Sequence, residues 1–146
     1  MIQNHSAAPA ASFNQILKLA TGLLGMSGVA LGALGAHALK VQLATSSHTE
    51  TWNTAVLYHL IHTIAILAVS VRPAHAGQSG KSCYLTAACV FWMVGVILFS
   101  GSLYLLALGG PHWLGPITPL GGLALLIGWG CVLATALKAP STQNDQ

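Results

Sequence analysis

Residues 85–108 read LTAACVFWMVGVILFSGSLYLLAL, an apolar stretch without a single charged side chain. A helix of about 20 apolar residues is long enough to cross the hydrocarbon core of a lipid bilayer. The apolar residues are continuous and do not alternate with polar ones, so a helix is favoured over a strand of a membrane β-barrel. The stretch therefore predicts a membrane-spanning helix.

Three further apolar runs accompany this one. Together they predict an all-α integral membrane protein, a four-helix bundle with spans at about Leu19–Leu39, residues 50–71, Leu85–Leu108 and Thr118–Leu137. Because the connections are short, neighbouring spans are expected to be antiparallel, running up and down in turn. We expect residues 1–146 to form one membrane domain, with polar tails at 1–15 and 139–146.

The second span is expected to begin before its apolar run, which covers Ala55–Val71. Ser47-His48-Thr49-Glu50 fits the capping box S/T-x-x-E, which predicts a helix that starts at about Ser47 and continues into the membrane. Trp52 of this helix and Trp113 of the last connection are expected at the outer interface, because indole rings favour that region.

The composition of the whole chain agrees with a membrane location. Hydrophobic residues make up 54% of the 146 residues and charged residues 5%, whereas a soluble domain has about 25% charged residues. So few charges cannot cover a water-soluble globule, and disordered chains are rich in charge. The basic residues are also too scattered for a nucleic-acid surface. We expect a lipid bilayer as the main partner and no nucleic acid.

The distribution of basic residues predicts the orientation. One side of the predicted bundle collects four of them, and the other has only Lys40, with Glu50 nearby; the four are Lys18, Arg72, Lys81 and Lys138. Cytoplasmic loops carry the excess of Lys and Arg in membrane proteins. Both termini are therefore expected in the cytoplasm.

Small residues recur on single faces of three predicted spans, which indicates close helix packing, since small side chains let helix backbones approach in lipid. The predicted packing residues are Gly25, Gly28, Gly32, Gly35, Gly95, Gly101, Ser102, Gly121 and Gly128. Internal packing or self-association is the favoured interpretation, and a groove for a partner helix is the alternative.

Histidines supply the main chemistry that the spans offer. His59 and His62, expected in the outer half of the second span, are spaced i, i+3, and His37 ends the first span. Ionisable residues inside a membrane are functional candidates. With His37 as third ligand they could bind copper, zinc or haem iron. Alternatively, the histidines and neighbours such as Tyr58 hydrogen-bond to one another and hold the helices in register. We expect no cofactor; a bound metal, haem or quinone is the alternative.

Catalytic motifs are missing from the sequence. No predicted span contains a carboxylate, and there is no Ser/His/Asp set, H-E-x-x-H motif, P-loop or dinucleotide fingerprint. We therefore expect a protein that is not an enzyme. The first hypothesis is an accessory or helper subunit that packs on another membrane complex. A binding module built on the histidines and a small channel or carrier are the alternatives.

Four segments resemble a known family. They are Gly32–Leu39 (GALGAHAL), the stretch from Trp52 through Tyr58 to His62-Thr63, Phe99–Tyr104 (FSGSLY), and Thr118–Gly122 continued to Gly128-Trp129. The set, which covers about Leu19 to Leu137, resembles the YgdD/YwdK family of uncharacterised inner-membrane proteins, related to transmembrane protein 256. The resemblance implies four spans in a bacterial inner membrane and no established activity. His37 and His62 fall on motif positions.

Overall fold

The structure, a computed structural model, describes residues 13–72 and 79–137. Within these ranges the chain is helical and contains no strand, which confirms the predicted all-α class. The helices are α1 (Phe13–Ala36), α2 (Lys40–Thr45), α3 (Thr49–Ser70), α4 (Ser79–Ala107), the 3₁₀ helix η1 (His112–Leu114) and α5 (Ile117–Leu137).

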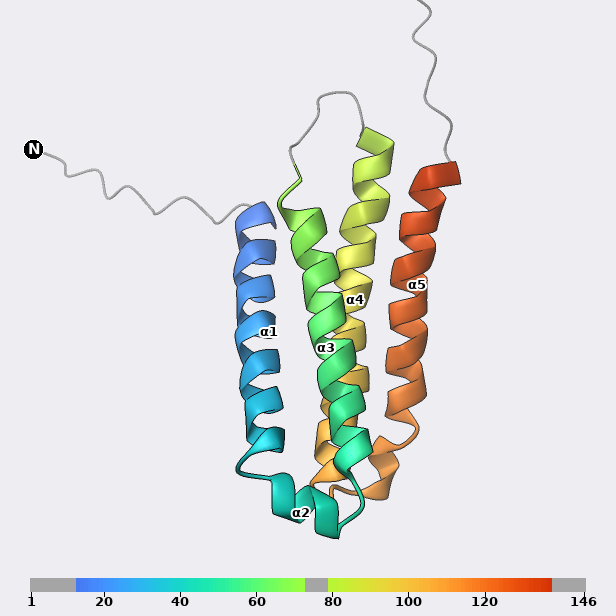
Figure 1. The fold of residues 1–146 in the computed structure, drawn as a ribbon. Coiled ribbons are helices and arrows are strands. Elements are labelled where there is room, and N and C mark those ends of the chain that lie inside the picture. Colours follow the sequence, from blue (N-terminus) through green and yellow to red (C-terminus); the bar gives the residue numbers. More distant parts are fainter. Residues whose placement is uncertain (1–12, 73–78, 138–146) are drawn as a thin grey trace, which may run out of the picture.

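Helices α1, α3, α4 and α5 are each long and apolar enough to cross a membrane. They run alternately in opposite directions (Figure 1). The short helices α2 and η1 lie at the same end of the bundle, where α2 connects α1 to α3 and η1 connects α4 to α5. The main contacts join consecutive spans: α1 packs on α3, α3 on α4, and α4 on α5. The spans therefore form a row in which α3 and α5, which run in the same direction, both pack on α4.

The ends of the first span differ from the prediction. Helix α1 begins at Phe13, where a polar tail was expected, and ends at Ala36. It includes Lys18, whose exposed side chain can lie along the helix with its charge toward the membrane surface. The rest of the predicted tails, residues 1–12 and 139–146, lies outside the described residues.

The predicted capping box at the start of the second span is wrong. Helix α3 begins at Thr49, its N-cap is His48, and no side chain caps it. Ser47 has a φ of 58°, in the left-handed region, because it turns the chain from α2 into α3. Ser47 therefore lies one residue before the N-cap position, and its hydroxyl does not cap the helix.

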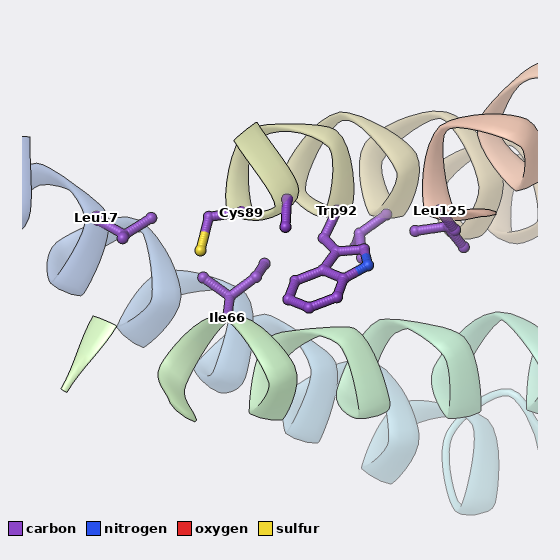
Figure 2. Close-up of a cluster of buried hydrophobic side chains, with 7 residues drawn as sticks. Leu17, Ile66, Cys89, Trp92 and Leu125 are labelled. Carbon is purple, nitrogen blue, oxygen red and sulfur yellow. The ribbon is translucent and has the colours of Figure 1, made fainter. Parts of the chain in front are cut away.

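Two clusters of buried side chains hold the row of helices together. The first draws on all four spans (Figure 2), with Leu17 from α1, Ile66 from α3, Cys89 and Trp92 from α4, and Leu125 from α5. The second lies toward the end of the bundle that carries α2, where it joins α2, α3 and α4. Its members are Leu43, Trp52, Ala55, Tyr104 and Ala107.

Candidate functional site

Four of the five glycines of α1 face α3, namely Gly25, Gly28, Gly32 and Gly35. A Cβ built on Gly25 would lie 3.7 Å from Cγ2 of Thr63, and one on Gly32 would lie 3.4 Å from Cγ1 of Val56. These are ordinary van der Waals distances. Both glycines therefore allow α1 to approach α3 closely.

Two further glycines of α1, Gly28 and Gly35, are in tighter places. A Cβ on Gly28 would lie 2.7 Å from Cδ2 of Leu60, and one on Gly35 would overlap the indole of Trp52. The Trp52 indole N–H donates a hydrogen bond to the carbonyl oxygen of Leu31, 3.1 Å away. The indole, 2% exposed, is therefore buried against α1, and its place at the membrane interface stays a prediction.

Glycines also receive side chains where α4 meets α5. A Cβ on Gly95 would overlap the side chain of Leu125, and one on Gly128 would lie 2.5 Å from Cδ1 of Trp92. Each helix therefore offers a glycine to a large side chain of the other. This reciprocal arrangement brings the two helix axes close together.

The closest approach of these two helices is at Gly121. A Cβ there would overlap the backbone of Phe99, and would lie 2.8 Å from the carbonyl carbon of Leu98. The hydroxyl of Ser102 is 2.7 Å from that of Thr118, which adds a hydrogen bond between α4 and α5. Gly101, in contrast, makes no such contact, since a Cβ there would meet no atom within 4 Å.

His59 lies between three helices, with 5% of its surface exposed. Its Nε2 is 3.5 Å from the hydroxyl of Ser27 on α1, and its Nδ1 is 3.4 Å from the hydroxyl of Tyr104 on α4. Both distances are longer than those of typical hydrogen bonds. His59 therefore connects α1, α3 and α4 through weak polar contacts.

His62 points toward α5 and uses both of its ring nitrogens. Its Nδ1 is 2.8 Å from the carbonyl oxygen of Tyr58. Its Nε2 accepts a hydrogen bond from the indole N–H of Trp129, 3.1 Å away. A neutral imidazole with its proton on Nδ1 satisfies both contacts at once. A metal on Nε2 would displace Trp129.

The structure does not bring the three candidate metal ligands together. His37 follows the end of α1 and is exposed. His59 and His62 lie on the central turns of α3, which begins at Thr49. They also face different helices. Among residues 13–72 and 79–137 no group of three His, Cys, Asp or Glu side chains could hold a metal ion.

Aromatic rings surround His62. The Tyr58 ring stacks on His62 with 5.9 Å between centroids, and it lies 4.7 Å from the ring of Phe99. Trp129 lies edge-on to His62 at 6.1 Å and at 4.8 Å from Trp92. Tyr58 and Trp129 are 40% and 47% exposed, whereas Trp92 is buried. The result is an aromatic surface across α3, α4 and α5.

Sequence reasoning missed the roles of the tryptophans in this region. Trp52 and Trp129 both donate hydrogen bonds to neighbouring helices, and Trp92 fills the space over Gly128. The available signal was the chemistry of the indole. A buried indole usually finds an acceptor for its N–H, although the N–H of Trp92 has none among the described residues.

Comparison with known proteins yields relatives but no activity. A family model for proteins of unknown function, DUF423, matches residues 31–122. The UPF0382 membrane protein YwdK of Bacillus subtilis is 36% identical over 110 residues, 75% of this chain and 86% of that protein. The UPF0382 inner membrane protein YgdD of Escherichia coli is 35% identical over 126 residues, 86% of this chain and 92% of that protein. No solved structure matches the chain.

Proposed function

The chain belongs to the DUF423 family of membrane proteins of unknown function, and from that premise we propose that it is a non-enzymatic accessory subunit of a larger membrane complex. The observation that carries the proposal is the exposure of α1. In the most apolar part of α1, 11% of the residues are buried inside the protein. In the most apolar part of α4, the share of buried residues is 39%. We propose that the open side of α1 packs on another membrane protein.

The open side of α1 has the composition of a helix–helix interface. One face of this side consists of Gly22, Met26, Val29, Ala33 and Ala36, which follow one another at intervals of three or four residues and are all exposed. The exposed side chains of Leu19 and Leu23 lie beside this face. A Cβ on Gly22 would meet no atom within 4 Å. This face lies about 100° around the helix from the glycines that pack on α3. Small residues on it would allow the backbone of a partner helix to approach.

The connections between spans support an accessory role in a second way. The two that the structure describes, between α1 and α3 and between α4 and α5, contain only the short helices α2 and η1. Glu50, in the first turn of α3, is the only carboxylate among the described residues. A protein of this kind acts most simply through contacts within the membrane, and the proposed role requires no catalytic residue.

The proposal is tested by the substitution Gly22→Leu in the full chain. The chain is purified from its native membrane in a mild detergent, at its native expression level, and its mass is measured with any bound partner. We expect one stoichiometric partner with the wild-type chain. We expect Gly22→Leu to lose that partner, because the leucine side chain would occupy the space of the partner helix.

Gly130→Leu is the matched control. Gly130 lies on α5, and a Cβ built there would also meet no atom within 4 Å, so both substitutions leave the packing of the chain itself unchanged. The control should keep the partner. Recovery of the wild-type chain without any partner, or equal loss of the partner from both variants, would contradict the proposal.

We also propose that both termini are cytoplasmic. The start of α1, the end of α3, the start of α4 and the end of α5 share one end of the bundle (Figure 1), and Lys18 and Arg72 lie near it. Lys81 and Lys138 belong to the same argument, although the structure describes neither side chain. The end with the excess of positive charge normally faces the cytoplasm.

A membrane-impermeant maleimide applied to intact cells checks this orientation. Cys83 is exposed near the proposed cytoplasmic end, and His112 is exposed at the opposite end. We expect the native chain to remain unlabelled and His112→Cys to be labelled. Labelling of the native chain through Cys83, without additional labelling of His112→Cys, would reverse the proposed orientation.

A further inference from the structure

Tyr58 differs from the other polar side chains near the middle of α3. The hydroxyl of Thr63 donates to a backbone carbonyl, the hydroxyl of Tyr104 contacts His59, and the indole of Trp129 donates to His62. The Tyr58 hydroxyl makes no hydrogen bond to any residue that the structure describes. Its side chain is nevertheless 40% exposed on a surface that faces lipid.

The depth of Tyr58 restricts what its hydroxyl can bind. Along α3 (Thr49–Ser70), Tyr58 lies about 14 Å from the start and about 18 Å from the end, at 1.5 Å per residue. The hydrocarbon core is about 30 Å thick, so this position is close to its middle. Water, ions and lipid headgroups are scarce there, and a polar group without a partner is unfavourable. The acceptor must therefore belong to a molecule that is itself soluble in lipid.

The rings beside Tyr58 favour a planar molecule. Phe99 of α4 lies 4.7 Å from the Tyr58 ring, and on the α5 side it faces Gly122, where a Cβ would be 3.7 Å from the Phe99 ring. Phe99 is half-buried, so part of its side chain is open to the surroundings. Trp129, 47% exposed, continues the aromatic surface beyond His62. Aromatic rings bind other planar rings by offset or edge-to-face contacts.

We propose that Tyr58, Phe99 and Trp129 bind the ring of a lipid-soluble quinone, with the Tyr58 hydroxyl donating a hydrogen bond to a quinone carbonyl. A quinone combines a planar conjugated ring, carbonyl oxygens that only accept hydrogen bonds, and an apolar tail that keeps it in the hydrocarbon core. Sterols and phospholipids hold their polar groups at the interface, too far from Tyr58. The site uses no metal and does not depend on the accessory role.

The test uses the full chain in lipid nanodiscs and a decyl-substituted benzoquinone as the probe. Quinones quench indole fluorescence, and Trp129 lies at the site. We expect quenching of the wild-type chain to saturate as the quinone is added. Tyr58→Phe keeps the ring and removes only the hydroxyl, so it should raise the quinone concentration at half-saturation about five-fold, the effect of one lost hydrogen bond.

A stability measurement and a control variant accompany the test. Tyr58→Phe should unfold at the wild-type denaturant concentration, because the hydroxyl has no partner among the residues that the structure describes. Ile64→Ala, on the same helix and 65% exposed, should keep the wild-type half-saturation. Quenching that rises without saturation in every variant, or equal half-saturation in Tyr58→Phe and the wild type, would overturn the proposal. So would a change of oligomeric state in Tyr58→Phe, since another chain would then cover the hydroxyl.

Discussion

Replacement of Gly121 by alanine is expected to lower the free energy of unfolding by about 3 kcal/mol, at the upper end of what an inserted methyl group costs in a packed interior. The added Cβ would overlap the backbone of Phe99 and approach that of Leu98. A side chain can rotate away from a clash, but a helix backbone cannot. The whole of α5 would therefore have to move away from α4, and Gly95 and Gly128 would lose their contacts as well.

Gly130→Ala is the control for this prediction. It lies on the same helix, and its Cβ would meet no atom within 4 Å. Alanine is favoured over glycine in a helix by about 1 kcal/mol, so the control should be as stable as the wild type or slightly more stable. The measurement is unfolding of both variants in mixed detergent micelles as the denaturing detergent is increased. If both variants unfold at the same fraction of denaturing detergent as the wild type, α4 and α5 are not as close as described.

Replacement of Gly35 by alanine should lower the free energy of unfolding by about 2 kcal/mol. The new methyl group would overlap the indole of Trp52. That ring has little freedom to move, because its N–H is bonded to the carbonyl of Leu31 and its face meets Tyr104 at 4.8 Å. The end of α1 that carries Gly35 would therefore be pushed away from α3, the helix that holds it in the row.

The same unfolding measurement, with two further variants, isolates the cause. Gly22→Ala adds a methyl group to the same helix where no atom lies within 4 Å, and should cause no loss. Trp52→Phe removes the indole nitrogen, which is the ring atom nearest to the new methyl group. The double variant Gly35→Ala/Trp52→Phe should therefore lose less than the sum of the two single losses. Strictly additive losses would mean that the two residues do not contact each other.

The spans were predictable from the sequence because the bilayer imposes a simple rule on length and polarity. The prediction for α5, 118–137, differs from Ile117–Leu137 by a single residue. The start of α1 was less predictable, since Lys18 made the first residues look like a tail. A long cationic side chain is tolerated near the end of a span because its charge can reach the interface.

The helix faces were predictable only in part. The spacing of Gly25, Gly28, Gly32 and Gly35 predicted one packing face, and these residues do share the face that meets α3. The spacing could not say which helix would be opposite. It also could not distinguish Gly121, which meets a backbone, from Gly101, which meets nothing. That difference depends on which helices are neighbours, and no residue of one helix encodes it alone.

The candidate site was less predictable than the fold. The i, i+3 spacing of His59 and His62 suggested that the two side chains bind one metal ion, because such residues are neighbours on a helix. In the structure each ring turns to a different helix, His59 to Tyr104 and His62 to Trp129. The partner that decides each orientation is remote in the sequence, 45 and 67 residues away. Local spacing carries no information about such contacts.

The row of consecutive contacts has a consequence for biogenesis. As the ribosome delivers the spans to the insertion machinery, α3 meets α1 already in place, α4 meets α3, and α5 meets α4. Each docking step closes only a short loop, which keeps its entropic barrier low. Assembly can therefore proceed in the order of synthesis, because each helix meets its principal neighbour as soon as the next span has been inserted.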